Sequence, residues 1–547
     1  MTDIAHTNSY PEFYNDVFGP VMQPGSSSHT AGPCRLGYLA NSLLGETPQH
    51  VQMIMDSTSS FSGTFGLMAE DRAMLAGALG LLPDDGRLFQ SSSIADQFGV
   101  SYGYEFGDMK ESTHPNAVKF VLTGQSGRVV SLVGDSTGGG MIETRLVNGY
   151  PFQYKGDAFA LLLFDAQDGL LGETMESIAG RLSGLVGSGR SSIPGRGNLL
   201  YFLCVDPPDP HWVNSALASY QPAILRPVLA VLSSSKRKPQ LFNSMTGWRS
   251  FAQELHMPLW EAAVQYEMDA SGWQRAEVLD FMRMLERKMY RQTHAPYEEP
   301  VKAPENPFRP DMAGEWEAYR TSPGRLTSDL TAEIIRLAYG AGAGIPGVEG
   351  VAGPMGSGGG YIHAALWAVK QAKGFSDQDL LRGLFIAASI GAIAYSRTEP
   401  TGERIGCTGE TGICGAMAAG AIAEMAGGTP EQVENAASMM LQAVIGLPCD
   451  PIPGGFGQPC RSRILTATCM AHIFADLALA GRKAVLPLHE AIDMADAVGR
   501  RLPPELLCTS QGGAACMPSA MHQAAEYSAW RKKAEEDGLP LPPGNLI

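Results

Sequence analysis

The chain has 547 residues, of which 44% are hydrophobic and 18% charged, and its formal net charge is −16 at pH 7. This length predicts two to four domains, and the hydrophobic content excludes a chain that is disordered throughout. The negative charge argues against nucleic acid as the main partner, although it leaves room for a local basic patch.

The N-terminus and the cysteines indicate the compartment. Residues 1–6 lack a basic segment followed by an apolar run, and no stretch approaches about 18 uninterrupted apolar residues. We therefore expect neither a secretory signal nor a membrane span. The nine cysteines are too few and too scattered to form a disulfide framework. The sequence predicts a protein of the reducing cytoplasm.

Residues 1–150 mix helical and strand patterns and predict an α+β domain. Helical periodicity covers 34–44 and 72–81, and strand-like runs cover 118–122 and 129–132. The polar segment His114-Pro115-Asn116 precedes the first of these strands. A single histidine in such a place is more often structural than catalytic.

A polar loop at 24–33, called the serine loop below, precedes the first helix. It carries, in order, Ser26, Ser27, Ser28, His29 and Thr30. Hydroxyls and backbone N–H groups ahead of a helix N-terminus attract anions, because the helix dipole and the unpaired amides both favour negative charge. The loop could hold a substrate carboxylate, or it could simply cap the helix with a solvated serine run.

Residues 151–240 alternate strands and helices, in an order typical of a ferredoxin-like αβ sandwich. The strands are predicted at 158–164 and 198–205, and the helices at 173–183 and 211–219. The segment resembles a small regulatory ACT-type domain, although the Asn/Asp-Pro-Gly turn of such domains is only loosely kept at 165–169. We expect a structural or interface module, with or without a ligand.

Residues 241–547 are mostly helical and predict a compact domain of short, closely packed helices. A proline-rich segment at 293–310 is expected to be an extended connector. The helices are predicted at 260–269, 277–290, 377–395, 415–425, 430–446, 464–479 and 488–499. The fold class is therefore α+β and multidomain, with three domains at 1–150, 151–240 and 241–547.

Three cysteines of the helical region lie in turn-rich settings. Cys407 follows a glycine, and Cys449 and Cys460 each follow a proline. Such residues let the backbone bend around a ligand and present amide groups to it. Three thiolates from separate loops suit a metal centre, above all an iron–sulfur cluster. Spacing alone also allows three buried cysteines that act as small hydrophobes.

Motifs from both halves of the chain occur together. They are Ser26-Ser27-Ser28-His29-Thr30 with Gly32-Pro33, His114-Pro115-Asn116, the glycines at 138–140, Gly406-Cys407 with Gly409-Glu410, Cys449-Asp450-Pro451, Pro459-Cys460 and 509–513. The set resembles the iron–sulfur-dependent L-serine dehydratases (L-serine ammonia-lyases), with a β-type domain at the N-terminus and an α-type domain at the C-terminus. Forty-one residues and then ten separate the three cysteines, as in this family.

The resemblance implies a 4Fe-4S cluster held by Cys407, Cys449 and Cys460, with one iron left without a protein thiolate. Such an iron acts as a Lewis acid on a substrate hydroxyl while a base removes the α-proton. The expected reaction converts L-serine to pyruvate and ammonia. In some family members a cysteine near the C-terminus occupies the open site. Cys516 is the first candidate for that position here, and Cys508 is the second.

The remaining site residues follow from the same resemblance. His29 or His114 is expected to be the base, and the sequence leaves the choice open. Glu410 would hold the substrate amine or order the cluster loop. The other residues expected to bind a small-molecule substrate are Ser26, Ser27, Ser28, Thr30, Asn116, Asp71 and Ser357. Regulatory modules of this type often pair between subunits, so we expect a homodimer.

Three stretches depart from the family pattern. A Gly-His-Gly-Thr-Asp run is common in the family, whereas residues 67–71 read Leu-Met-Ala-Glu-Asp, and only Asp71 matches. Residues 442–446 and 461–464 also replace polar motifs beside the second and third cysteines. Arg461 and Arg463 would suit an extra carboxylate or another anion.

These departures leave two alternatives beside serine dehydration. The same elimination chemistry could act on a different β-hydroxy or β-substituted amino or hydroxy acid, one more acidic than serine. A non-catalytic, cluster-bearing sensor of amino acids is the second alternative, but it would leave the serine loop unexplained.

Overall fold

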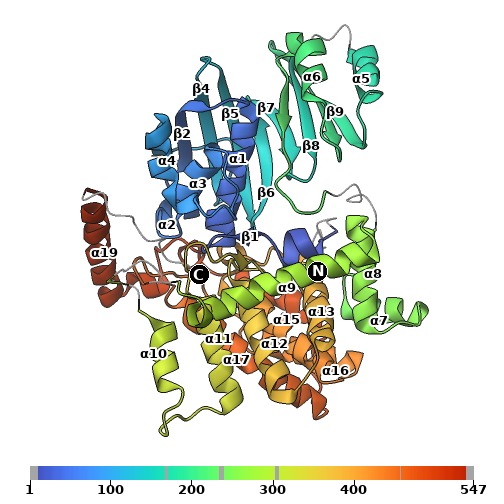
Figure 1. The fold of residues 1–547 in the computed structure, drawn as a ribbon, viewed down its shortest axis with the longest axis vertical. Coiled ribbons are helices and arrows are strands. Elements are labelled where there is room, and N and C mark those ends of the chain that lie inside the picture. Colours follow the sequence, from blue (N-terminus) through green and yellow to red (C-terminus); the bar gives the residue numbers. More distant parts are fainter. Residues whose placement is uncertain are drawn as a thin grey trace.

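The computed structural model describes residues 10–166, 171–232, 239–301, 307–308, 310–455 and 457–536. Two sheet-containing parts lie at one end of the molecule and a helical part lies at the other (Figure 1). The protein is thus a mixed α+β protein of several domains, as the sequence predicts. Within the described ranges, every helix is too short or too polar to cross a lipid bilayer.

The N-terminal sheet has six strands in the order β3-β2-β4-β5-β6-β7. β2 and β3 are parallel, and the other neighbours are antiparallel. Side chains alternate between buried and half-exposed along β4, because α1 and α3 cover one face of the sheet. The elements are α1 (Gly32–Leu44), β2 (Pro48–Asp56), α2 (Ser60–Thr64), α3 (Glu70–Ala78), α4 (Ser91–Phe98), β3 (Ser101–Gly107), β4 (Ala117–Gly124), β5 (Val129–Gly138), β6 (Met141–Val147) and β7 (Tyr150–Tyr154).

The two covering helices, α1 and α3, approach each other almost backbone to backbone. A Cβ atom at Gly77 of α3 would lie 2.0 Å from the carbonyl oxygen of Cys34 in α1, so only glycine fits there. Near the C-terminal ends of both helices, the Asn41 amide donates to the Ala78 carbonyl at 2.9 Å. α1 and α3 therefore form a closely packed pair.

The second sheet is antiparallel, with strand order β11-β8-β10-β9. Its chain order is strand, helix, strand, strand, helix, strand, which is the ferredoxin-like order. The sequence missed β9 because its residues are mostly small or polar and half-exposed. Of the predicted turn at 165–169, residues 167–169 lie outside the described part. The elements are β8 (Phe159–Ala166), α5 (Leu171–Ala179), β9 (Leu185–Ile193), β10 (Gly197–Cys204), α6 (Pro210–Ala216) and β11 (Ala223–Leu225).

The helical part is centred on α15 (Ile413–Met425), a helix of mostly small residues whose side chains are nearly all buried. Helices α12, α13, α16 and α17 pack around it. The other elements are α7 (Met245–Glu254), α8 (Leu259–Ser271), α9 (Arg275–Glu298), α10 (Met312–Tyr319), α11 (Asp329–Ala341), α12 (Gly358–Lys373), α13 (Asp377–Tyr395), α14 (Gly402–Ile405), α16 (Pro430–Gln442), α17 (Cys460–Leu479), α18 (Leu488–Gly499) and α19 (Pro518–Glu536).

The expected connector at 293–310 starts later than predicted. Residues 293–298 belong to α9, although Pro296 lies inside the last turns of that helix. Thr293 and Ala295 are buried, and α9 packs against α11 and α12, so tertiary packing outweighs the local effect of the proline. The expectation of extended backbone from 293 was wrong for these residues. Residues 302–306 and 309 lie outside the described part.

The first described residues belong to the helical part rather than to the N-terminal sheet. Phe13 and Phe18 are buried in the helical core. β1 (Val21–Met22) pairs with β12 (Gly350–Val351), which precedes α12. From residue 10 the chain thus runs from the helical part through both sheets and back to the helical part. This path holds the serine loop, which follows β1, at the junction between the N-terminal sheet and the helical part.

Candidate active site

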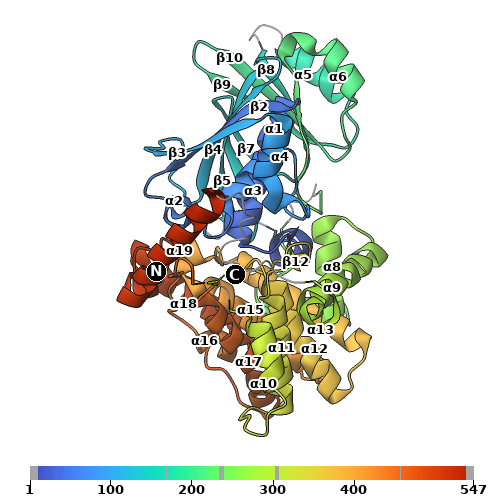
Figure 2. The ribbon, with the colours of Figure 1, turned by 60° about the vertical axis from the view of Figure 1, so that its left-hand side comes forward.

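The serine loop lies where the N-terminal sheet meets the helical part (Figure 2). Three of its hydroxyls are committed to holding the loop in shape. Ser26 Oγ accepts the His29 backbone N–H at 3.2 Å, Ser27 Oγ donates to the Pro354 carbonyl at 3.1 Å, and Thr30 Oγ1 donates to the Met68 carbonyl at 2.6 Å. The geometry therefore gives Ser26, Ser27 and Thr30 a role in the fold of the loop, and leaves Ser28 and His29 to act at the junction.

Ser28 and His29 begin a buried chain of hydrogen bonds that crosses the junction. Ser28 Oγ lies 2.8 Å from His29 Nδ1, and His29 Nε2 lies 2.9 Å from Ser60 Oγ. Ser60 Oγ in turn donates to the Cys508 carbonyl at 2.7 Å. All three side chains are at most 2% exposed. The chain links the start of α1 to the C-terminal region of the protein.

The direction of these bonds defines the protonation of His29. Since the Ser60 hydroxyl uses its proton on the Cys508 carbonyl, it must accept the bond from His29 Nε2. His29 Nδ1 is then unprotonated and accepts from Ser28. Burial lowers the pKa of His29 to about 3. His29 is therefore neutral at pH 7 and works as a hydrogen-bonding relay rather than as a cation.

Asn116 and Glu403 meet at the same junction. The Asn116 amide donates to Glu403 Oε1 at 2.7 Å, and both side chains are buried. The Ser28 hydroxyl is also within hydrogen-bonding reach of the Glu403 carboxyl. Burial raises the pKa of Glu403 to about 7. This carboxyl therefore changes its charge near neutral pH.

His114 precedes Asn116 and is partly buried. Its Nδ1 accepts the Asn116 backbone N–H at 3.1 Å, so the proton of the neutral ring is on Nε2. Burial and the nearby Arg404 lower the pKa of His114 to about 4. His114 Nε2 and Asn116 Oδ1 are buried atoms without a hydrogen-bond partner among the described residues. Both atoms are suited to receive a polar ligand.

The three predicted cysteine ligands come together in the structure. Cys407, Cys449 and Cys460 are each at most 3% exposed. The Cys460 thiol interacts with the thiols of both Cys407 and Cys449. The Thr411 hydroxyl lies 3.0 Å from Cys407 Sγ. The sequence thus predicted a real convergence of three buried thiols from three separate segments.

A fourth thiol joins this group, and it belongs to Cys508 rather than to Cys516. The Cys449 N–H donates to the Leu506 carbonyl, and the Cys508 N–H donates to the Cys449 carbonyl, each at 2.8 Å. These bonds place Cys508 beside Cys449, and the two thiols interact. Cys516 ends a short 3₁₀ turn, Gly513–Cys516, and is itself exposed. The structure thus places Cys508, the second candidate, nearer the group than Cys516, because backbone pairing determines which thiol is near.

The chemistry of this buried group fits an iron–sulfur cluster. A Cβ atom at Gly402 would lie 2.7 Å from Cys449 Sγ and 3.5 Å from Glu410 Oε2, so glycine leaves room between the thiol and the carboxyl. Among the described residues, no three His, Cys, Asp or Glu side chains surround a position for a single metal ion. Sulfur is the donor that iron–sulfur clusters take, so the residue types suit a cluster.

Glu410 lies on the thiol side of the site, as predicted. It belongs to η6 (Thr408–Gly412), which joins Cys407 to α15. Burial, together with the nearby Glu403 and Cys407, raises the pKa of Glu410 well above its ordinary value. These surroundings therefore favour the neutral, protonated form of the Glu410 carboxyl.

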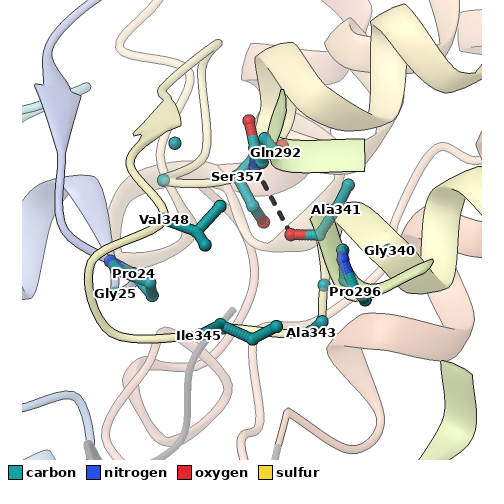
Figure 3. Close-up of a pocket in the computed structure, with 14 residues that line it drawn as sticks. Pro24, Gly25, Gln292, Pro296, Gly340, Ala341, Ala343, Ile345, Val348 and Ser357 are labelled. Atoms are coloured by element: carbon teal, nitrogen blue, oxygen red, sulfur yellow. Dashed lines mark hydrogen bonds between the residues drawn. The ribbon is translucent and has the colours of Figure 1, made fainter. Parts of the chain in front are cut away.

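Asp71 and Ser357 are not part of this group. Asp71 is paired with Arg531 of α19 at 2.6 Å, so it anchors the C-terminal helix. Ser357 precedes α12 and lines a separate small pocket with Gly25, Gln292 and Ile345, into which its side chain points (Figure 3). The loop of Ser357 packs against Gly25 and thus supports the serine loop from behind.

The arginines near the third cysteine differ in their surroundings. Arg463 donates to Asp450 Oδ1 at 2.7 Å and to the Pro448 carbonyl at 2.6 Å. It is therefore committed to the loop that carries Cys449, which argues against a role in holding an extra substrate anion. Arg461 is buried at the start of α17, near Tyr361 and Cys460.

Comparison with known proteins assigns the family. A family model described as serine dehydratase alpha chain matches residues 254–515. The L-serine dehydratase beta chain of Peptoniphilus asaccharolyticus is 32% identical over 166 residues, which are 30% of this chain and 74% of that one. The alpha chain of the same organism is 33% identical over 199 residues, 36% of this chain and 68% of that one. The chain belongs to the L-serine dehydratase family.

The family model matches the helical part, and the chain does not cover every relative in full. An alpha chain from Bacillus subtilis (strain 168), named a probable L-serine dehydratase, is 38% identical over 166 residues, 30% of this chain. The match spans 55% of that relative's length, or about half. L-serine dehydratases are described as alpha and beta chains in these organisms, and one chain here matches both kinds.

Sequence reasoning missed Ser60, Glu403 and the position of Cys508. Ser60 ends the hydroxyl run at 57–60, which resembles the serine loop in composition. Glu403 stands one helical turn before Cys407 and shares the Gly402–Gly406 segment. Both signals were available locally. The position of Cys508 had no local signal, because it depends on pairing with Cys449.

Thiol labelling tests the cysteine assignment. We expect a disulfide reagent such as DTNB to label one thiol rapidly in the native metal-free protein, because Cys516 is exposed while the four grouped cysteines are buried. Cys516→Ser should abolish the rapid phase, and Cys508→Ser should leave it unchanged. A rapid phase that disappears in Cys508→Ser would contradict the placement of Cys508.

Proposed function

We propose that the protein is an L-serine dehydratase that converts L-serine to pyruvate and ammonia. The observation that carries the proposal is the junction itself, where a buried group of thiols adjoins the Ser28–His29–Ser60 chain and the Asn116–Glu403 pair. The names of the relatives support serine as the substrate. They give no support to an acidic substrate or to a non-catalytic sensor.

We propose that Cys407, Cys449 and Cys460 hold a 4Fe-4S cluster, with Cys508 beside it as a fourth thiol. When bound, such a cluster supplies a Lewis-acid iron to the substrate hydroxyl. The protein contributes a buried, sulfur-rich setting for the cofactor. Backbone pairing with Cys449 keeps Cys508 close to it.

Residues of the N-terminal sheet would bind the amino acid. His114 Nε2 carries the proton of a neutral ring and can donate to the substrate carboxylate. Asn116 Oδ1 can accept from the ammonium group. Both atoms are buried without a partner among the described residues, so a ligand that bonds to them removes an unfavourable state. This arrangement orients the α-carbon toward Glu403, which Asn116 also holds.

Glu403 is our candidate for the base, in place of the two histidines. His114 uses its unprotonated nitrogen to accept a backbone N–H, and His29 has a pKa of about 3, which makes it a weak base. The pKa of Glu403, about 7, matches the operating pH. Glu403 would take the α-proton, and Ser28 and His29 would orient its carboxyl.

Glu410 would serve as the acid. Its pKa lies well above the ordinary range, so at neutral pH it carries a proton that it can give to the departing hydroxyl, which leaves as water. Loss of the α-proton and of water gives 2-aminoacrylate. This enamine tautomerises to an imine, and water then releases ammonia and pyruvate.

The second sheet, with its helices α5 and α6, forms a four-stranded module that would be an ACT-like regulatory domain. Its strand–helix–strand–strand–helix–strand order supports this proposal. We further propose a cytoplasmic homodimer, since all nine cysteines are free and modules of this kind often pair between subunits.

A substrate panel tests the proposed reaction. Protein purified and reconstituted without oxygen should release 2-oxo acid and ammonia from L-serine. Threonine, cysteine and 3-hydroxyaspartate are compared under the same conditions. If 3-hydroxyaspartate were turned over and serine were not, the acidic amino acid rather than serine would be the substrate. A protein that binds iron and turns over none of the four would point to the sensor.

Cys449→Ser tests the cofactor. We expect the variant to lose most of its bound iron and its charge-transfer absorbance, because a hydroxyl is a poor ligand for a soft metal centre. Cys204→Ser is the matched control, since Cys204 is equally buried but lies in β10 of the four-stranded sheet. Iron content equal to the wild type in Cys449→Ser would contradict the ligand assignment.

Glu403→Gln tests the base. The wild-type kcat should rise with pH through about 7, because the base must be ionised and its pKa lies there. Glu403→Gln should lower kcat by about 10²–10⁴-fold and lose this pH dependence while keeping its iron. Glu424→Gln, at a partly buried carboxyl on α15 with a raised pKa, is the control and should keep the wild-type profile. An unchanged kcat in Glu403→Gln would exclude it as the base.

A further inference from the structure

Two buried hydroxyls at the junction have no role in the site described so far. Tyr395 is the last residue of α13, and Thr401 directly precedes α14. Their oxygens, Oη and Oγ1, are buried and lack a hydrogen-bond partner among the described residues. A threonine before a helix usually accepts a backbone N–H of the first turn, but the Thr401 side chain makes no such bond. Both oxygens are therefore available to a polar ligand.

A turn of three glycines lies against the two side chains. Gly138, Gly139 and Gly140 lead from β5 into β6, and each has a positive φ, of 93°, 60° and 77°. A Cβ atom at Gly138 would lie 1.8 Å from Thr401 Cγ2, and one at Gly139 would lie 2.4 Å from Tyr395 Oη. Only glycine suits both this conformation and this contact. The turn thus fixes the positions of both side chains relative to the N-terminal sheet.

The strand before this turn connects it to the substrate groups proposed above. Ser136 of β5 donates its hydroxyl to the Ser28 carbonyl at 2.7 Å and its backbone N–H to the Asn116 carbonyl at 3.0 Å. Asn116 Oδ1 is a third buried oxygen without a partner among the described residues. The amide of Asn116 binds Glu403, and Thr401 lies two residues before Glu403. Asn116 and Thr401 are thus both neighbours of Glu403, one in space and one in the chain.

The surroundings of the Tyr395 hydroxyl are acidic. Burial raises the pKa of Tyr395 well above its ordinary value, and so do the neighbouring ionisable groups of Asp16, Cys414, Glu410 and Glu403. Tyr395 therefore stays a neutral hydroxyl, which can accept a hydrogen bond as well as donate one. Acidic surroundings attract a cation and repel an anion. The charged group of an amino acid that suits them is its ammonium group.

We propose that Asn116 Oδ1, Thr401 Oγ1 and Tyr395 Oη bind the ammonium group of the substrate. An ammonium group has three N–H donors, and each of the three oxygens can accept one. The hydroxyl of a 2-hydroxy acid has a single hydrogen and no charge, so it can donate to only one of them. The subsite therefore selects an α-amino acid over the corresponding 2-hydroxy acid. This inference rests on the proposed function, since it adds Thr401 and Tyr395 to the same substrate site.

Two small molecules without a leaving group at the β-carbon test the binding. L-alanine carries the ammonium group, and L-lactate carries a hydroxyl in its place on a molecule of similar size. In isothermal titration of the protein reconstituted without oxygen, L-alanine should bind more tightly than L-lactate by about tenfold or more. Tyr395→Phe and Thr401→Val should each weaken the binding of L-alanine about 10–100-fold, the effect of losing one hydrogen bond to a charged group. The binding of L-lactate should change far less.

Ser389→Ala is the matched control. Ser389 lies on the same helix as Tyr395 and is fully buried, and its hydroxyl also lacks a partner among the described residues. Its neighbours in the chain, Ala388 and Ile390, belong to the helical core. Removal of this hydroxyl should leave the binding of both molecules unchanged, because it has no place in the subsite.

The outcomes separate this inference from the proposed function. The ammonium subsite would be overturned if L-alanine did not bind, if L-lactate bound as tightly, if L-alanine binding survived both substitutions, or if the substitutions weakened both molecules equally. In protein that turns over serine, Tyr395→Phe should raise the KM for serine about 10–100-fold and change kcat much less. Binding of L-alanine that depends on Tyr395 and Thr401, in protein that does not turn over serine, would overturn the proposed function and leave the subsite standing.

Discussion

The bond between Asn116 of the N-terminal sheet and Glu403 of the helical part joins the two halves of the candidate active site. Both side chains are removed from water, so separating them would leave two buried polar groups unsatisfied, at a cost of about 1–3 kcal/mol for each. The same carboxyl contacts Ser28 of the serine loop. Through this one carboxyl, the helical part contacts both the N-terminal sheet and the serine loop.

Two carboxyls that lie close together in the site, Glu403 and Glu410, differ in pKa. Glu403 accepts a hydrogen bond from the Asn116 amide, and the nearby Arg404 favours its ionised form and partly offsets the effect of burial. Glu410 lies nearer the thiols and has fewer such bonds, so its proton is held more tightly. In the proposed reaction, Glu403 accepts the α-proton and Glu410 donates a proton to the departing hydroxyl. Elimination of water from an amino acid requires both events.

Short local motifs made part of this site predictable. Cys407, Cys449 and Cys460 could be recognised from their glycine- and proline-rich neighbours and from their spacing. Ser28 and His29 could be recognised from the polar run ahead of a helix. Ser60 and Cys508 were out of reach, because their contact joins residues 448 positions apart in the sequence. Cys516 was preferred over Cys508 because no local pattern reveals that Cys508 pairs with Cys449. The pairing of Cys449 with residues 506–508 arises only once the helical part has folded.

The fold shows the same division between local and tertiary information. Most helices and the strands β4, β5, β8 and β10 follow from local apolar patterns, because each of these segments buries apolar side chains. β9 was missed since its polar and small residues carry no alternation, and it forms because β10 supplies its hydrogen bonds. Pro296 stays within α9 because its neighbours are buried. In each of these cases the partner, rather than the segment itself, decides the structure.

The loss of the usual histidine near residue 68 is explained by the way the halves are joined. Met68 stands where the family commonly has that histidine, and its backbone carbonyl holds Thr30 instead. In the proposed reaction, the acid–base group comes from the other domain, as Glu403. Such a site works only while the domains stay docked. Here one chain contains both, and the N-terminal segment at β1 and the Arg531–Asp71 pair of α19 tie them together. Docking is thus an intramolecular event whose effective concentration far exceeds that of two separate chains.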